Sequence, residues 1–218
     1  GKSDAAEVLV VMHGETDDSY LYAHRGTRVR KLHTSRRDAF RTVNDYPIFK
    51  VEGKNILEIK PPLLRRDLKR KLVVKPRFEQ NVALVKTYPG ISPSIIDHLV
   101  DNNYRGMVIE GSGLGHAPTQ INDAIERAID SGLIVAMTSQ CIFGRVDMNV
   151  YRSGVELLDL GVIPCEDMLP ETALVKLMWL LANRKSPEEV KSDLNKPIVR
   201  EIGMRTEYGE YLAKKEVK

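Results

Sequence analysis

The feature of this sequence that most constrains its fold is a regular alternation of apolar runs and amphipathic segments between residues 82 and 194. Four runs have the length and composition of buried strands: 82–85, 106–110, 133–138 and 162–163. The other segments have the apolar spacing of helices: 94–100, 118–129, 153–160, 171–183 and 187–194. Strands that alternate with helices predict an α/β fold with a parallel, doubly wound sheet and helices on both faces.

The first 60 residues follow a different pattern. Short strands are expected at 7–12 and 20–23, and a hairpin is expected over 48–59, with Gly53 in its turn. Residues 35–40 are expected to open a short helix, capped by Thr34 or Ser35.

A basic segment, 60–77, separates the two patterns. It holds eight Lys and Arg residues against Asp67 alone, and Pro61 and Pro62 interrupt regular structure at its start. We interpret it as a solvated linker, and an RNA-facing patch is the alternative.

Composition excludes several classes of protein. The net charge of +3 is too small to imply nucleic-acid binding by the whole surface. Cys141 and Cys165 are too few for a zinc site or a disulfide scaffold, which favours a reducing, intracellular setting. No apolar run reaches the roughly 18 residues of a membrane span, and 7–12 is too short for a leader, so we expect no membrane contact and no signal peptide.

The glycine-rich stretch Gly111-Ser-Gly-Leu-Gly115 lies between an expected strand and an expected helix. Its G-x-G-x-G spacing differs from the dinucleotide fingerprint, and no acidic residue ends the next strand, so we do not expect NAD. Open α/β sheets nevertheless bind ligands at this edge, which makes Ser112, Gly113 and His116 candidate binding residues. A tight turn without a ligand is the plain alternative. Ser139, which ends the next strand, lacks the surroundings of a nucleophilic serine.

A basic cluster, 25–37, contains six Lys and Arg residues within thirteen positions. The cluster is either an exposed surface or the environment of one functional residue, Lys31. Like charges around a lysine disfavour its ammonium form, and a lysine with a lowered pKa can accept a proton from a hydroxyl nucleophile.

Four segments together resemble the L-asparaginase/glutaminase family: 29–40, 48–59, 110–116 and 161–179. The resemblance extends over roughly residues 7–200. It implies an asparaginase-like fold, in which 1–60 ends a large catalytic α/β domain and 61–80 is a basic linker. It further implies a smaller flavodoxin-like domain at 81–195 and a polar tail at 196–218.

The resemblance also implies a mechanism, in which a threonine attacks the side-chain amide of glutamine or asparagine. A second threonine, an aspartate and a lysine handle protons, and Lys31 matches that lysine. His116 occupies a position where many asparaginases carry an asparagine that one protomer lends to its neighbour, so Ser112, Gly113 and His116 become candidate substrate-binding residues. The resemblance implies no metal and no cofactor for this polypeptide.

The family's two threonine motifs, Thr-Gly-Gly-Thr and Gly-Thr-Asp-Thr, are absent from these 218 residues. We therefore expect the chain to be the C-terminal part of an enzyme. We expect it to be inactive without its N-terminal remainder, with the Lys31 ammonium in a crevice shared with a hydroxyl from outside this polypeptide.

The amino-acid sequences of 31–40 and 110–119 resemble those of one branch of the family, the archaeal tRNA-dependent amidotransferases. That branch implies a cytoplasmic, homodimeric glutaminase that supplies ammonia for converting Glu-tRNA(Gln) to Gln-tRNA(Gln). A partner amidotransferase subunit of the E type would hold ATP and Mg²⁺, and tRNA would bind through the complex. A free L-asparaginase and a non-catalytic α/β assembly domain remain the alternatives.

Overall fold

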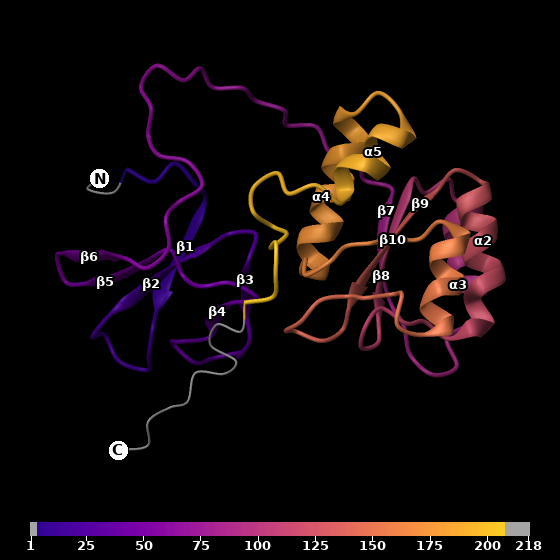
Figure 1. The fold of residues 1–218 in the computed structure, drawn as a ribbon, viewed down its shortest axis with the longest axis horizontal. Coiled ribbons are helices and arrows are strands. Elements are labelled where there is room, and N and C mark those ends of the chain that lie inside the picture. The colour runs from indigo at the N-terminus through magenta and orange to yellow at the C-terminus, as the bar shows by residue number, and fades with distance from the viewer. Residues whose placement is uncertain (1–3, 208–218) are drawn as a thin grey trace. The chain divides into compact units, whose positions relative to one another are not determined.

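The computed structural model describes residues 4–207, which form two compact units (Figure 1). Of the described residues, unit 1 comprises 4–73 and 199–207, and unit 2 comprises 74–198. Within the described part of the chain, no helix is long and apolar enough to cross a membrane.

Unit 2 is built on a four-stranded parallel sheet, which confirms the α/β prediction. The strands lie in the order β10-β9-β8-β7, and neighbours pair in parallel. Their bounds are β7 Val82–Lys86, β8 Gly106–Gly111, β9 Ile134–Ser139 and β10 Ile163–Pro164.

Helices cover both faces of this sheet, with α4 on one side and α2 and α3 on the other (Figure 1). Met107 and Ile109 of β8 belong to the core on the α1–α3 side. Gly106 faces α4, because a Cβ there would lie 2.9 Å from the Leu177 side chain. The helices are α1 Ser94–Asp101, α2 Asn122–Asp130, α3 Arg152–Leu160, α4 Pro170–Asn183 and α5 Pro187–Leu194. A 3₁₀ turn, Thr119–Ile121, precedes α2.

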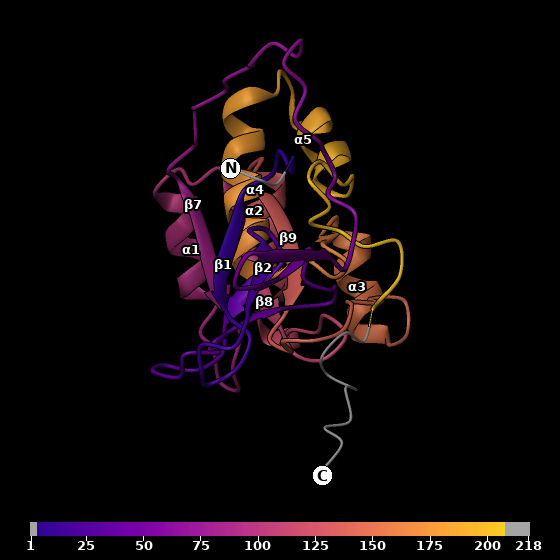
Figure 2. The same ribbon diagram turned by 90° about the vertical axis from the view of Figure 1, so that its left-hand side faces the viewer.

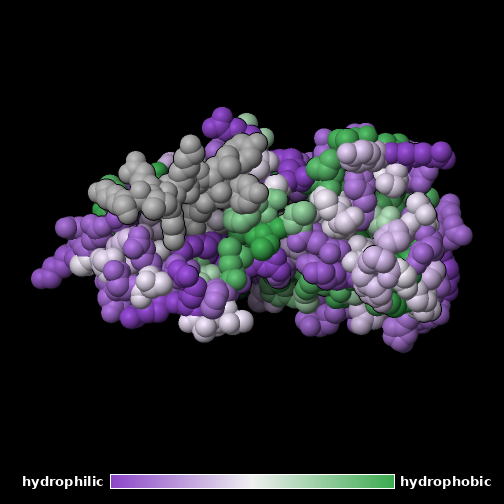
Figure 3. All heavy atoms as spheres, turned by 90° about the horizontal axis from the view of Figure 1, so that it is seen from below, coloured by the Kyte–Doolittle hydropathy of each residue, from purple (hydrophilic) through white to green (hydrophobic). Residues whose placement is uncertain are grey.

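Unit 1 contains an antiparallel sheet in the order β1-β2-β5-β6 (Figure 1), of which β1 and β2 are labelled in Figure 2. Its core is small, with Ala23, Ile48 and Phe49 buried and Leu9 packed against them. The expected hairpin is present, and Gly53 takes φ +54° in its turn. The strands are β1 Leu9–His13, β2 Leu21–Arg25, β5 Phe49–Glu52 and β6 Asn55–Glu58. The face of unit 1 drawn in Figure 3 is mostly hydrophilic where atoms of described residues are visible.

The helix predicted at 35–40 is wrong, because Phe40 begins a strand instead. β3 (Val29–Lys31) and β4 (Phe40–Thr42) form a separate two-stranded sheet in which Lys31 pairs with Phe40. His33 Nδ1 accepts hydrogen bonds from the backbone N–H of Ser35 at 3.1 Å and of Arg36 at 3.0 Å. Such local side-chain bonds give the backbone an alternative to helical hydrogen bonding.

Two segments lack regular secondary structure. Residues 61–80 contain neither a helix nor a strand, apart from one bridge between Arg65 and Ala5. Within the segment predicted as a polar tail, residues 199–207 are grouped with unit 1, and Glu201 is only 1% exposed. Residues 208–218 lie outside the described part of the chain.

Candidate functional site

Lys31 lies at the end of β3 with an exposed side chain. Its ammonium is 5.9 Å from the centroid of the Phe40 ring, a cation–π distance. Among residues 4–207 it has no hydrogen-bond or ion-pair partner, and the crevice expected around it stays a prediction.

Several arginines of the basic cluster around Lys31 form ion pairs with acidic residues. The Arg25 guanidinium is buried, and its Nε and Nη2 donate to the Glu7 carboxylate at 2.7 and 3.1 Å. Arg36 donates two hydrogen bonds to the Asp38 carboxylate, from Nε and Nη2, and Arg37 donates to Asp18 at 2.5 Å. Three of the five arginines in the cluster therefore pair with carboxylates. The prediction that Lys31 lies among unpaired like charges loses its support.

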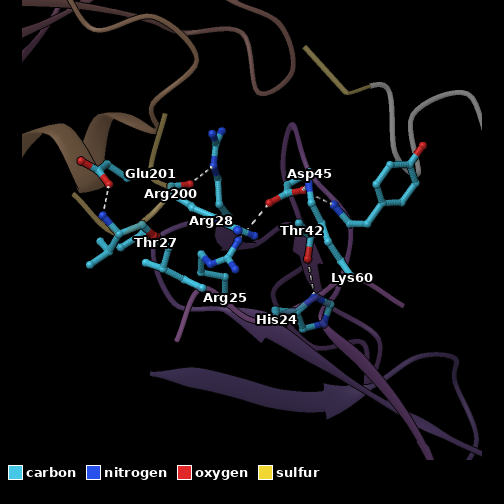
Figure 4. A network of polar contacts seen from close by, with 12 residues as sticks. His24, Arg25, Thr27, Arg28, Thr42, Asp45, Lys60, Arg200 and Glu201 are labelled. Atoms are coloured by element: carbon cyan, nitrogen blue, oxygen red, sulfur yellow. Dashed lines mark hydrogen bonds and ion pairs between the residues drawn. The ribbon is translucent and has the colours of Figure 1, made fainter. Parts of the chain in front are cut away.

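Asp45 is the second acidic centre of unit 1. It is 5% exposed, accepts a hydrogen bond from Arg25 Nη1 at 3.3 Å and forms an ion pair with Lys60. Figure 4 shows Asp45 between Arg25 and Lys60, with His24 below them. Because two cations converge on one buried carboxylate, the arrangement is a structural clamp.

The groups of unit 1 whose pKa values depart from the ordinary ones include His24, Asp38 and Glu7. Burial, with the nearby Arg41 charge, lowers the pKa of His24 to about 4, and His24 Nδ1 lies 2.8 Å from Thr42 Oγ1. The hydrogen bond from Arg36, opposed by burial and aided by the Arg41 charge, lowers the pKa of Asp38 to about 2. Burial raises the pKa of Glu7, but hydrogen bonds from Arg25 and the backbone outweigh this, so the net pKa is lowered.

The chain returns to this network after unit 2. Arg28 Nε donates to the Arg200 carbonyl at 2.9 Å (Figure 4), and Arg200 Nη1 donates to the Pro61 carbonyl at 3.2 Å. A cavity of about 260 Å³ lies here, and Lys31 is not among its described lining residues. The cavity is lined by residues of this network and its neighbours, among them Arg28, Asn44, Asp45, Lys60 and Arg200.

The structure brings the three candidates of unit 2 together in one tight turn after β8. Ser112 and His116 exchange backbone hydrogen bonds, with Ser112 N–H donating at 2.8 Å and His116 N–H at 3.0 Å. Gly113 and Gly115 take φ values of +51° and +100° inside the turn. A Cβ at Gly111 would lie 2.7 Å from Met137 Sδ, so close packing alone requires this glycine.

His116 is the member of this turn with the most specific surroundings. Its Nδ1 lies 3.2 Å from Ser153 Oγ, and its ring meets the Tyr151 ring edge-on at 5.3 Å. Its Nε2 is buried and has no hydrogen-bond partner within residues 4–207. Ser112 and Gly113 are exposed. The turn therefore holds one buried ring nitrogen without a partner in the described residues, next to two exposed residues.

Two polar residues at the end of β9 hold the same edge together. Ser139 Oγ donates to the Gly113 carbonyl at 2.6 Å, so its hydroxyl supports the loop. Gln140 Nε2 donates to the carbonyls of Thr87 at 2.6 Å and Glu110 at 3.0 Å, which ties the ends of β7 and β8 to β9.

Sequence reasoning missed Gln140, Tyr151 and Ser153. A signal for Gln140 was present, since it follows the same strand end as Ser139. Ser153 lies 37 positions from His116, and no local pattern links them. No cluster of three or more His, Cys, Asp or Glu side chains able to hold a metal is found in the described residues.

The comparisons with known proteins cover both units. The family profile named Asparaginase, N-terminal, matches residues 1–63, and the Glutaminase/Asparaginase C-terminal domain profile matches residues 81–192. Among curated proteins, the glutamyl-tRNA(Gln) amidotransferase D subunit of Pyrococcus abyssi is 55% identical over 96% of this chain and 48% of its own length. The D subunit of Metallosphaera sedula is 50% identical over 91% of this chain and 45% of its own length. The chain thus spans about half the length of the curated relatives it matches.

Solved structures show the same fold. The thermostable L-asparaginase from Thermococcus kodakarensis superposes with a TM-score of 0.76 at 31% identity, over 84% of this chain and 55% of its own. L-asparaginase I from Vibrio cholerae gives a TM-score of 0.78 at 30% identity, over 93% of this chain and 59% of its own. The predicted asparaginase-like fold is therefore confirmed, and the chain belongs to the glutaminase/asparaginase family.

Proposed function

We propose that this chain is part of the glutaminase component of a tRNA-dependent amidotransferase. The observation that carries the proposal is the contrast in identity between two kinds of relative. Identity to the amidotransferase D subunit of Pyrococcus abyssi is 55%, against 31% and 30% to two L-asparaginases. The ammonia released from glutamine would serve the conversion of Glu-tRNA(Gln) to Gln-tRNA(Gln).

The proposed reaction needs a hydroxyl that these 218 residues do not supply in a family motif. A threonine oxygen from the N-terminal remainder attacks the carboxamide carbon of glutamine, the C–N bond breaks, and ammonia leaves. Water then hydrolyses the ester to glutamate and regenerates the threonine. We assign Lys31 to the proton-handling group, and its exposed ammonium is available to such a segment. His116, Ser112 and Gly113 are assigned to the contact with substrate.

The direct test combines the chain with a polypeptide that carries both threonine motifs. Ammonia release from glutamine is measured for the combined protein and for the chain alone, which we expect to be inactive. Lys31→Met should lower ammonia release by about 10²–10⁴-fold, the usual range for losing a proton-transfer group. Lys54→Met, an exposed lysine in the β5–β6 turn, is the matched control. Activity of the isolated chain would refute its dependence on a companion, and a fully active Lys31→Met protein would refute the Lys31 assignment.

Partners form a second part of the proposal. We propose a homodimer that associates with a partner amidotransferase subunit of the E type, which holds ATP and Mg²⁺, and a cytoplasmic location. Co-purification with that partner and tRNA would separate this function from that of a free L-asparaginase, which the two solved structures make the second candidate. A glutamine titration with and without the companion polypeptide separates both from a non-catalytic assembly domain.

The basic segment 60–77 offers a third test. If it contacts tRNA, charge reversal at Lys69, Arg70 and Lys71 should weaken tRNA binding by the complex and lower its salt dependence. If it is a solvated linker, the same variant should bind tRNA as the unaltered complex does.

A further inference from the structure

His116 is held by two side chains from the start of α3, a helix that begins 36 residues later in the chain. Ser153 Oγ lies 3.2 Å from Nδ1, and the Tyr151 ring lies edge-on at 5.3 Å with an interplanar angle of 71°. The backbone of His116 is already fixed by its paired hydrogen bonds with Ser112. Ring rotation is therefore the main remaining freedom, and these two contacts restrain it.

A neutral imidazole carries one N–H and one lone pair, so the proton on one nitrogen decides what the other offers. A serine hydroxyl can donate or accept, which means that the contact distance alone does not set the tautomer. The second observation is the place of Ser153 in the first turn of α3. The N–H groups at a helix start create a positive potential, which favours a lone pair over an N–H on Nδ1.

We propose that Ser153 donates its hydroxyl proton to Nδ1 and thereby holds His116 in the tautomer with the proton on Nε2. Ser153 and Tyr151 are then positioning residues. The inference rests on the proposed function, in which His116 contacts glutamine. The Nε2–H is then the ring donor without a partner among the described residues. It donates to an oxygen of the substrate, either a carboxylate or the carboxamide carbonyl, which displaces the atoms that cover Nε2.

This arrangement has a consequence for specificity. An asparagine at this position, as in many asparaginases, presents an amide that can turn either a donor or an acceptor to the ligand. A histidine locked by Ser153 presents only a donor. The site therefore selects ligands with an oxygen acceptor at this point and rejects those that offer only an N–H.

The test measures the tautomer directly. Two-bond ¹⁵N–¹H NMR spectra of the 218-residue chain are recorded above the pH range in which histidine titrates, and the His116 signals are assigned by their loss in His116→Asn. We expect one tautomer, with the proton on Nε2. In Ser153→Ala the spectrum should move toward a mixture of tautomers, and Ser153→Thr should restore the single form.

Ser92→Ala is the matched control, because Ser92 precedes α1 and its hydroxyl contacts Ser94 Oγ at 2.7 Å. It should leave the His116 signals unchanged. A proton on Nδ1 in the unaltered chain would overturn the proposal, as would a Ser153→Ala spectrum identical to it.

Glutamine is then added to the chain combined with the companion polypeptide. A shift of the Nε2 signal supports the substrate contact. If the tautomer behaves as expected and glutamine shifts nothing, the positioning role of Ser153 stands while the assignment of His116 to substrate binding fails.

Discussion

The two units of this protein are stabilised in opposite ways. In unit 2 every residue of the central strand β8 is buried, and a continuous apolar core joins three helices to the sheet. In unit 1 every residue of β6 is exposed, and the apolar core is small. Unit 1 instead buries charged side chains, above all Arg25 and Asp45. The difference teaches that one unit depends on apolar packing and the other on a paired polar network.

The largest effect is expected from removing the centre of that network. Arg25→Met removes the guanidinium that donates to both buried carboxylates, Glu7 and Asp45, so unit 1 should lose about 3–5 kcal/mol of unfolding free energy. Chemical denaturation, with hydrogen exchange to assign the loss to a unit, measures this. Arg152→Met is the control, because the Arg152 side chain is 93% exposed and its ion pair with Glu156 is worth less than about 1 kcal/mol. Equal losses of unfolding free energy in the two variants would show that the buried ion pairs do not stabilise unit 1.

The matching experiment in unit 2 removes apolar volume. Ile109→Ala opens a cavity in a fully buried site of the core and should cost about 2–5 kcal/mol, with hydrogen exchange increased in unit 2. Ile95→Ala makes the same change on α1 at a side chain that is 37% exposed, and should cost far less. A small loss at Ile109 would mean that packing is not what stabilises this unit.

Acid should separate the units further. The pKa of His24 is about 4 in the folded protein and about 6.5 when exposed, so the unfolded chain binds more protons between these values. Stability from this group is complete above pH ~6.5 and falls as the pH drops toward ~4, by up to about 3 kcal/mol. Asp38, with a pKa of about 2 against 3.8, adds a loss between those two values.

Unfolding of the chain between pH 7 and 4 measures the His24 contribution. In His24→Gln the unfolding free energy should change less between pH 7 and 4, since glutamine does not titrate. In unit 2, burial raises the pKa of Cys165 to about 12, which affects stability only in alkali. Acid unfolding that begins in unit 2 would contradict the assignment.

The smallest effect concerns one helix cap in unit 2. Ser186 Oγ accepts a hydrogen bond from Glu189 N–H at the start of α5, and Ser186→Ala should cost about 1 kcal/mol. Ser192→Ala, inside the same helix, removes only an exposed hydrogen bond from Lys196 Nζ and should be close to neutral, because alanine favours helices. Thermal unfolding compares the two, and equal midpoints would show that the cap contributes nothing.

Prediction from sequence was more successful in unit 2 than in unit 1. The amphipathic spacing of Ile121, Ala124, Ile125, Ala128 and Ile129 predicted one apolar helical face. The first four are buried, and Ile129 is half-buried. At 35–40 the prediction of a helix failed, since hydrogen bonds to His33 and strand pairing with Lys31 outweigh a capping pattern. A tight turn was one of the two interpretations of the glycine-rich stretch 111–115. The contact between His116 and Ser153 was not predicted, because it spans 37 positions.

The sequence by itself determined the alternation of strands and helices in unit 2, because local periodicity sets which face of each element is apolar. It also determined the family, through motifs that lie within short segments. Only the tertiary structure decided which charges pair, such as Arg25 with Glu7 and Asp45, and how Arg28 meets Arg200 across 172 positions. These contacts join residues that no local pattern connects, because ion pairs and tautomers depend on distances in space and not on spacing along the chain.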